Sequence, residues 1–149
     1  SDRNFVVIHP NNDQGGDIVL DALEPLRANP RFRFYPSIRF EFFLVLLRNA
    51  SVIVGNSSVG IREAPVYGVP TINIGTRQQN RFKHPSIINV PEDREAVLQA
   101  LKNLPPRAEP SLFFGSGQSA SLFMKVLQSS RILQLGPQKQ FRDLAAFPS

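Results

Sequence analysis

The residues best suited to chemistry in this sequence form a turn, GNSS at residues 55–58, that directly follows a short apolar stretch. The hydroxyls of Ser57 and Ser58 and the backbone amides of such a turn bind phosphate oxygens, especially where a helix begins. Gly60 would let a ligand approach the backbone closely. A structural role suits the same residues, because Asn56, Ser57 or Ser58 would also cap the following helix.

Charged and polar side chains near this turn extend the chemistry from a phosphate to a nucleotide. Glu63 lies about one turn into the expected helix, where it would accept hydrogen bonds from a ribose diol. Arg62 and Arg77 are candidate phosphate partners, and Gln78 follows Arg77 directly. The structural alternative is that Glu63 merely favours the dipole of its helix.

A second polar stretch, HPNND at residues 9–13, also follows an apolar segment. In an open α/β sheet, ligands bind at the carboxyl ends of the strands, which is where His9 and Asn11 would lie. His9 would donate a hydrogen bond to a phosphate. Its alternative role is that of a loop histidine held by Asn11 or Asp13.

The elements that must position these residues alternate between strands and helices. Residues 51–54 are apolar and β-branched, which predicts a strand buried on both faces. A helix is expected at residues 59–67, and Gly68 suits the left-handed position just after it. Pro70 ends any helix, so a second strand follows at residues 71–74. This unit puts the turn 55–58 at the carboxyl edge of a sheet.

The same alternation continues along the rest of the chain. Further strands are expected at residues 5–8, 31–35 and 86–90, and further helices at 17–28, 39–49, 92–104, 119–129 and 138–147. Pro25 should bend or shorten its helix, and the broadly apolar helix at 39–49 should be largely covered. With right-handed crossovers, the pattern predicts an α/β protein: a parallel sheet between two helix layers, a three-layer α/β/α sandwich.

The length of 149 residues suits one domain at 1–149. We expect a core at residues 1–104, a stiff proline-rich connection at 105–110 and C-terminal helices at 111–149.

Composition narrows the classes of function. The net charge is +5, but the basic residues are scattered, so we expect no nucleic acid partner. The longest apolar run, residues 42–47, is too short to cross a membrane. Cysteine is absent, which excludes disulfides and is consistent with a cytoplasmic protein. With only His9 and His84 as imidazoles, no metal site and no cofactor is expected.

The run GNSSVGIREAPVYGVPTINIGTRQ at residues 55–78 resembles the nucleotide-binding segment of the hydrolysing UDP-N-acetylglucosamine 2-epimerases. HPNND at residues 9–13 and PSIRFEFFLVLLRNA at residues 36–50 resemble the same family in the same order. The resemblance covers most of residues 5–101. These enzymes have two Rossmann-like domains in the arrangement called GT-B, and this chain resembles the second domain.

The resemblance implies that the parent enzyme eliminates UDP from UDP-N-acetylglucosamine and hydrates the resulting glycal, giving N-acetylmannosamine or a related sugar for sialic-acid-type biosynthesis. It implies UDP or a UDP-sugar as ligand, a missing N-terminal domain, and a homodimeric or tetrameric parent. The implied UDP-binding residues are His9, Ser57, Ser58, Gly60, Glu63 and Arg77, with Asn11, Asn56, Arg62 and Gln78 as further candidates. No proton-transfer residue is assigned, and the isolated chain should be inactive.

Two alternatives stay open at this point. A UDP-sugar-dependent glycosyltransferase of the GT-B fold would use the same diphosphate leaving group. A non-catalytic nucleotide-binding module would use the same turn without any reaction.

Overall fold

The computed structural model of the chain describes residues 3–11, 14–129 and 134. Two strands near the N-terminus, β1 (Phe5–Ile8) and β2 (Phe32–Tyr35), pair in parallel. The rings of Phe5 and Phe32 stack with their centroids 4.5 Å apart, which fixes the first step of the register. Between these strands lie the helix α1 (Gly16–Leu23) and the 3₁₀-helix η1 (Glu24–Leu26). The α-helix is shortened as expected, because Pro25 has no N–H to continue it.

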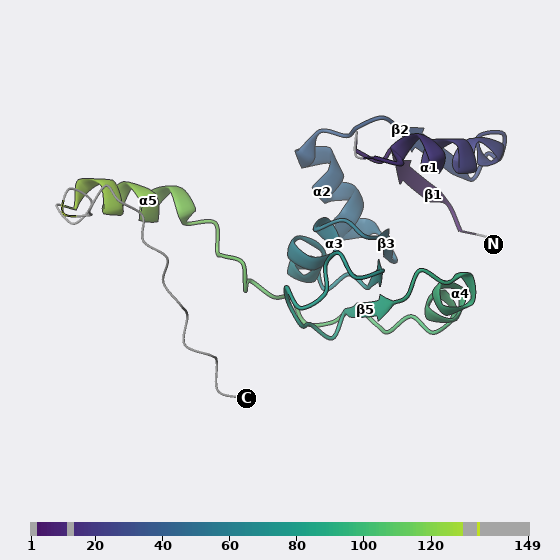
Figure 1. Ribbon diagram of the computed structural model, residues 1–149. Helices are drawn as coiled ribbons and strands as arrows, with labels where there is room; N and C mark the ends of the chain where they lie inside the picture. Colours follow the sequence, from purple (N-terminus) through teal and green to yellow (C-terminus); the bar gives the residue numbers. More distant parts are fainter. Residues whose placement is uncertain (1–2, 12–13, 130–133, 135–149) are drawn as a thin grey trace. The chain divides into compact units, whose positions relative to one another are not determined.

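A three-stranded parallel sheet follows, in the order β3 (Ile53–Gly55), β4 (Thr71–Ile74) and β5 (Ile87–Val90). The helix α2 (Phe40–Asn49) leads into β3, and α4 (Arg94–Lys102) follows β5 (Figure 1). The carboxyl oxygen Oδ1 of Asp93 caps α4 by accepting a hydrogen bond from the Ala96 amide at 2.8 Å. Each strand lies within two residues of the range that its apolar pattern predicts.

The segment between β3 and β4 is divided where the sequence predicts one helix. It consists of α3 (Val59–Arg62) and the 3₁₀-helix η2 (Ala64–Tyr67). Pro65 cannot donate a backbone hydrogen bond, which explains the break after Arg62. Gly68 follows with φ 63° and ψ 17°, so the predicted left-handed position is confirmed.

The α/β class with parallel sheets is confirmed, but the strands form two sheets where the sequence suggests one. In the described residues no ladder joins β1 to β3. The physical reason lies in the core. One buried cluster centres on Leu47, Ala64 and Val69, and a second on Ile72, Val90 and Ala100. Neither cluster includes a residue of β1, α1 or β2, so the two-stranded sheet stands outside the main core.

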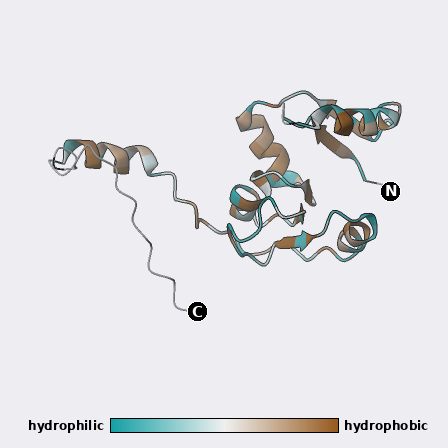
Figure 2. Cartoon of the chain, in the orientation of Figure 1, coloured by the Kyte–Doolittle hydropathy of each residue, from teal (hydrophilic) through white to brown (hydrophobic). Residues whose placement is uncertain are grey.

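Two expectations of burial are wrong. Among the residues of α2 only Leu47 is buried, whereas Phe40, Phe42 and Val45 are more than half exposed. Apolar residues surround nearly the whole of α2 (Figure 2), and only one side of a helix can face the core. The strand β3 is likewise not buried on both faces, because it is an edge strand and Val54 is 43% exposed.

The proline-rich connection at residues 105–110 has no regular secondary structure, as expected, and it is held against the first part of the chain. The Arg107 guanidinium donates to the carbonyl oxygens of Arg48 and Ala50, both at 2.8 Å, and of Tyr67 at 3.2 Å. Arg107 therefore binds terminal carbonyl groups of both α2 and η2 and links the C-terminal ends of the two helices. The Ala108 amide donates to the Gly68 carbonyl at 3.0 Å.

The chain divides into two compact units, residues 1–111 and 112–149. The described part of the second unit contains α5 (Ser119–Gln128), close to the predicted helix at 119–129. Its apolar side chains Leu122, Phe123, Val126 and Leu127 are exposed within the described structure. The helix predicted at 138–147 lies outside the described residues.

Candidate functional site

The turn predicted at residues 55–58 is one residue shorter in the structure, because Gly55 ends β3. Residues 56–58 stand between the end of β3 and the start of α3. The Ser57 hydroxyl oxygen lies 3.4 Å from the Val59 amide, which gives it a weak capping contact. Ser58 occupies the N-cap position of α3 but makes no side-chain cap hydrogen bond. The structural role of helix cap is therefore limited to Ser57, and the Ser58 hydroxyl is left for another partner.

Gly60 is buried in α3, and the close approach that it permits is that of β4. A Cβ atom built on Gly60 would lie 2.6 Å from the Thr71 methyl carbon. The Thr71 hydroxyl, in turn, donates to the Gly60 carbonyl at 2.9 Å. The Gly60 amide bonds the Ser57 carbonyl at 3.2 Å. Contact between α3 and β4 thus explains the glycine without any ligand.

Glu63 lies at the junction of α3 and η2, with its side chain partly buried. Its Oε2 atom is inaccessible to solvent and has no hydrogen-bond partner in the described structure. Burial raises the pKa of the Glu63 carboxyl above its ordinary value, while its own backbone hydrogen bond and the Arg62 charge act in the opposite direction. An unpaired buried carboxylate oxygen is an acceptor suited to a hydroxyl or amide donor.

A second polar turn, residues 76–79, follows β4 and is closed by a hydrogen bond from the Gln79 amide to the Thr76 carbonyl at 3.0 Å. Arg77 is exposed in this turn, whereas Gln78 is only 4% exposed. Gln78 Nε2 donates to the Asn56 carbonyl oxygen at 3.0 Å. This hydrogen bond joins the two turns, so the structure brings Arg77 and the serines to the same edge of the sheet.

His9 and Asn11 belong to a separate cluster at the carboxyl ends of β1 and β2. They line an open depression of about 470 Å³ together with the loop Pro36, Ser37 and Ile38. The His9 ring also faces Arg27, whose Nη2 lies 3.5 Å from His9 Nε2. Arg27 is held by Glu24 at 2.6 Å and lies over the Phe34 ring. Sequence reasoning missed Arg27, since a lone arginine near the end of a helix carries no distinguishing signal.

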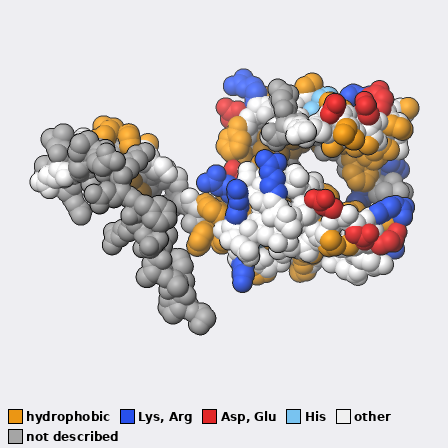
Figure 3. All heavy atoms as spheres, in the orientation of Figure 1, with side chains coloured by type: hydrophobic (Ala, Val, Ile, Leu, Met, Phe, Trp, Pro, Cys, Tyr) orange, Lys and Arg blue, Asp and Glu red, His pale blue; other side chains and the backbone are white. Residues whose placement is uncertain are grey.

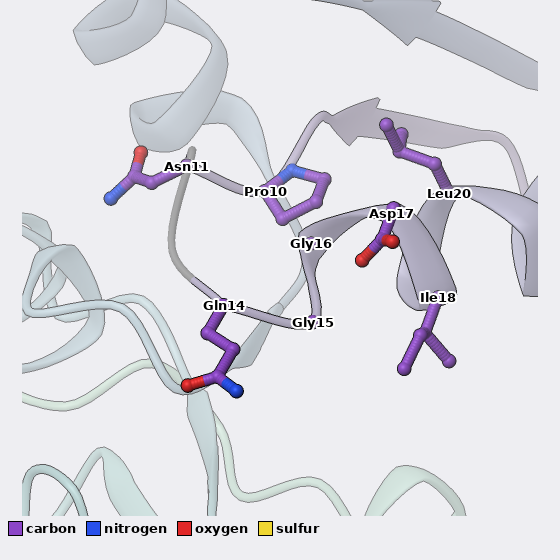
Figure 4. Close-up of a pocket in the computed structure, with 8 residues that line it drawn as sticks. All are labelled: Pro10, Asn11, Gln14, Gly15, Gly16, Asp17, Ile18 and Leu20. Atoms are coloured by element: carbon purple, nitrogen blue, oxygen red, sulfur yellow. The ribbon is translucent and has the colours of Figure 1, made fainter.

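An adjoining depression of about 640 Å³ is lined by Pro10, Asn11, residues 14–16 and the start of α1. Figure 4 shows Asn11 and Gln14 on that loop and Asp17 and Ile18 on the first turn of the helix. Gly15 has φ 87°, which only glycine adopts readily, and it makes the turn into α1 possible. This glycine thus shapes the entry into α1.

The predicted site residues therefore fall into two groups. One contains Asn56, Ser57 and Ser58 with the turn that holds Arg77 and Gln78, and the other contains His9 and Asn11. In the described part of the chain no hydrogen bond connects His9 to the turn at 56–58. Arg62 is exposed at the end of α3.

Sequence reasoning also missed a buried polar pair beneath the first group. Asn73 Nδ2 donates to Asn89 Oδ1 at 2.7 Å, and these residues are opposite one another in β4 and β5. Asn73 is 1% exposed and its Oδ1 has no partner among the described residues. The available signal was a single asparagine inside each of two apolar strands, TINI and IINV.

The described part of the first unit carries charges of both signs on its surface. On the face of the first unit drawn in Figure 3, Lys and Arg side chains are interspersed with Asp and Glu. Among the helices of residues 3–11, 14–129 and 134, none is long and apolar enough to span a bilayer.

Comparison with known proteins identifies the family. The profile of the UDP-N-acetylglucosamine 2-epimerase family matches residues 1–128. A UDP-N-acetylglucosamine 2-epimerase of Neisseria meningitidis serogroup B is 40% identical over 149 residues, covering 97% of this chain and 39% of the relative. The polysialic acid biosynthesis protein P7 of Escherichia coli is 36% identical over 99 residues, covering 66% of this chain and 25% of the relative.

A third relative is the UDP-N,N'-diacetylbacillosamine 2-epimerase (hydrolyzing) of Legionella pneumophila, which is 27% identical over 127 residues, or 84% of this chain and 34% of the relative. The chain thus spans well under half the length of each of these proteins. The family match includes the turn at 56–58, Glu63 and the turn at 76–79. The chain belongs to the UDP-N-acetylglucosamine 2-epimerase family.

Proposed function

We propose that this chain is the UDP-binding part of a hydrolysing UDP-N-acetylglucosamine 2-epimerase. The observation that carries the proposal is the meeting of the turns at 56–58 and 76–79 through the Gln78–Asn56 hydrogen bond, inside the segment that matches the family. Hydroxyls, backbone amides and a guanidinium at one edge of a sheet suit a diphosphate.

In the proposed reaction the parent enzyme breaks the C1–O bond of the UDP-sugar and removes the proton at C2, which gives UDP and a glycal. Water then adds across the glycal double bond, and the configuration at C2 is inverted. Negative charge grows on the diphosphate as the C1–O bond breaks. Ser57, Ser58, Arg77 and His9 would stabilise that charge. The groups that move the protons are not assigned to this chain.

Glu63 fits the ribose in this proposal. Its buried Oε2 has no partner in the described structure, and a ribose diol offers two hydroxyl donors. Gly60 keeps α3 against β4 and so sets the distance between the serine turn and the sheet. Asn11 and Arg62 are further candidate contacts, and the loop at 36–38 would face the base. A cytoplasmic location belongs to the same proposal.

The test separates nucleotide recognition from general attraction of anions. The 149-residue chain should bind UDP with a dissociation constant on the order of 0.1 to 1 mM, because a site completed by the rest of a longer protein would be weak here. Glu63→Gln should weaken the binding of UDP more than the binding of pyrophosphate, because pyrophosphate has no ribose. Titration calorimetry at constant salt measures the dissociation constants of both ligands.

Glu95→Gln is the matched control, since it removes the same charge from an exposed position on α4. It should leave the preference for UDP over pyrophosphate unchanged. If Glu63→Gln also leaves that preference unchanged, the ribose assignment is wrong. If the wild-type chain binds neither ligand, the proposed nucleotide site itself is wrong.

Activity belongs to the parent protein in this proposal. The 149-residue chain incubated with UDP-N-acetylglucosamine should release neither UDP nor N-acetylmannosamine, whereas the full-length parent should release both. Proton NMR of the reaction mixture detects the two products. Release by the short chain at the rate of the parent would show that the catalytic groups lie within these 149 residues.

A further inference from the structure

Gln78 differs from its neighbours in the turn at 76–79. Thr76, Arg77 and Gln79 are exposed, whereas Gln78 is 4% exposed. A buried amide is costly unless its polar atoms find partners. Nε2 has one, the Asn56 carbonyl oxygen at 3.0 Å, and Oε1 has none among the described residues. The assignment of the two amide atoms follows from Asn56, because a carbonyl oxygen only accepts.

Packing alone does not account for this side chain. An apolar side chain of similar length would fill the same space without leaving a buried acceptor unpaired. The feature that an apolar residue lacks is the N–H donor, and that donor is aimed at the backbone of a turn 22 residues earlier in the chain. The function of Gln78 therefore lies in what it does to the Asn56–Ser57 peptide.

The geometry of that peptide supplies the next step. In a trans peptide the C=O and the N–H point in opposite directions, and no cis peptide occurs in the described residues. Because the Asn56 carbonyl is directed toward the buried Gln78 amide, the Ser57 N–H is directed away from it. Ser57 is exposed, and in the described part of the chain its N–H has no hydrogen-bond acceptor. The hydrogen bond to the carbonyl also polarises the peptide and strengthens this N–H as a donor.

We propose that Gln78 is a positioning residue that orients the Asn56–Ser57 peptide so that the Ser57 N–H donates to an oxygen of the bound diphosphate. This inference rests on the proposed function, because it takes the diphosphate as the ligand of this edge. Gln78 itself acts from behind the turn and does not touch the ligand. It thereby replaces the direct ligand contact expected for Gln78 from the sequence.

The first variant is Gln78→Met, which keeps the length of the side chain and removes the donor. It should weaken the binding of UDP and of pyrophosphate to the same extent. Both dissociation constants should rise by about 3- to 10-fold, as expected for one lost hydrogen bond to the ligand. The ligand-induced shift of the Ser57 amide in ¹H–¹⁵N spectra should shrink. Gln79→Met is the matched control, since Gln79 is the exposed neighbour of the same type, and both constants should stay within about twofold of wild type.

The second variant, Gln78→Glu, offers a rescue that a structural role would not produce. The ionised carboxylate only accepts and would repel the Asn56 carbonyl, whereas the protonated acid has an O–H that donates to it. The ratio of the variant's dissociation constant for UDP to that of wild type should therefore fall toward 1 as the pH is lowered from 8 to 5. The charge of UDP changes equally in both titrations and cancels in the ratio.

Each result decides the proposal. Unchanged binding by folded Gln78→Met, or weakened binding with an unaltered Ser57 shift, would overturn it. If Gln78→Met does not fold, the Gln78→Glu ratio decides, and a ratio independent of pH would count against the proposal. If wild type binds no UDP, the proposed function fails. The positioning role is then decided separately by whether Gln78→Glu moves the Ser57 resonance of the free protein with pH while Gln79→Glu does not.

Discussion

The Thr71 hydroxyl donates a hydrogen bond to the carbonyl oxygen of Gly60 at 2.9 Å, and the methyl group of the same threonine fills the space that a Gly60 side chain would occupy. Thr71 in β4 thus fixes the position of α3 along the strand, through the hydrogen bond, and the spacing between α3 and β4, through the methyl group. The turn at 56–58 begins immediately before α3, so this contact bears on the position of the candidate site.

Gly60→Ala should lower the free energy of unfolding by about 1 to 3 kcal/mol, because the new Cβ would lie 2.6 Å from the Thr71 methyl carbon. Thr71→Ser removes that methyl and keeps the hydroxyl. The double variant should therefore recover much of the loss, as measured by urea denaturation of all four proteins. An equal loss from Gly60→Ala in both backgrounds would mean that the methyl is not the obstacle.

Gly68→Ala should be more destabilising than Gly15→Ala. Both glycines have positive φ, at 63° and 87°, so both substitutions strain the backbone. A Cβ on Gly68 would also collide with the Ala108 carbonyl oxygen, whereas one on Gly15 would have nothing within 4 Å. Gly68→Val should be worse still, because a β-branched residue suits this conformation least. Urea midpoints measure the order, and equal midpoints for the two alanine variants would contradict it.

Arg107→Lys should lower the free energy of unfolding by about 1 to 2 kcal/mol, although the charge is kept. A single ammonium cannot reach the three carbonyl oxygens of Arg48, Ala50 and Tyr67 that the guanidinium contacts. Arg94→Lys is the control, because Arg94 is exposed and, among the described residues, pairs with its neighbour Glu95. Equal denaturation curves for the two variants would show that the contacts of Arg107 with the ends of α2 and η2 do not stabilise the fold.

Glu63→Gln should stabilise the chain increasingly as the pH rises. Burial raises the pKa of Glu63 in the folded protein above 4.5, so folding favours the protonated acid. The contribution of Glu63 to stability is fully present below pH 4.5 and is lost as the pH rises through the raised pKa of the folded protein. A glutamine at this position does not ionise, so its contribution to stability does not fall as the pH rises.

Urea midpoints of wild type and Glu63→Gln between pH 4 and 8 test this expectation. The difference between their midpoints should widen as the pH rises through the raised pKa of Glu63. Parallel curves for wild type and Glu63→Gln would indicate that Glu63 titrates as a solvated carboxyl.

The sequence was sufficient for the features that depend on neighbours along the chain. The strands Phe5–Ile8 and Thr71–Ile74 match their predicted bounds, because short apolar runs between turn residues leave few alternatives. The left-handed Gly68 was predictable from the following Pro70 and the end of the helical pattern. The turn predicted at 55–58 was placed to within one residue for the same local reason, since Gly55 ends β3.

Tertiary structure alone decided the roles that depend on distant residues. Gly60 reads in sequence as a place for ligand approach, but it faces Thr71, 11 residues later. Gln78 was a further candidate for a direct ligand contact in the sequence, and only the fold shows that it is buried against Asn56. Arg107 reaches carbonyl groups 40 to 59 residues away. The same limit applies to the division into two sheets, since residues within one strand do not reveal which core will cover it. Local propensity selects the element, whereas contacts between elements far apart in the chain determine what each side chain does.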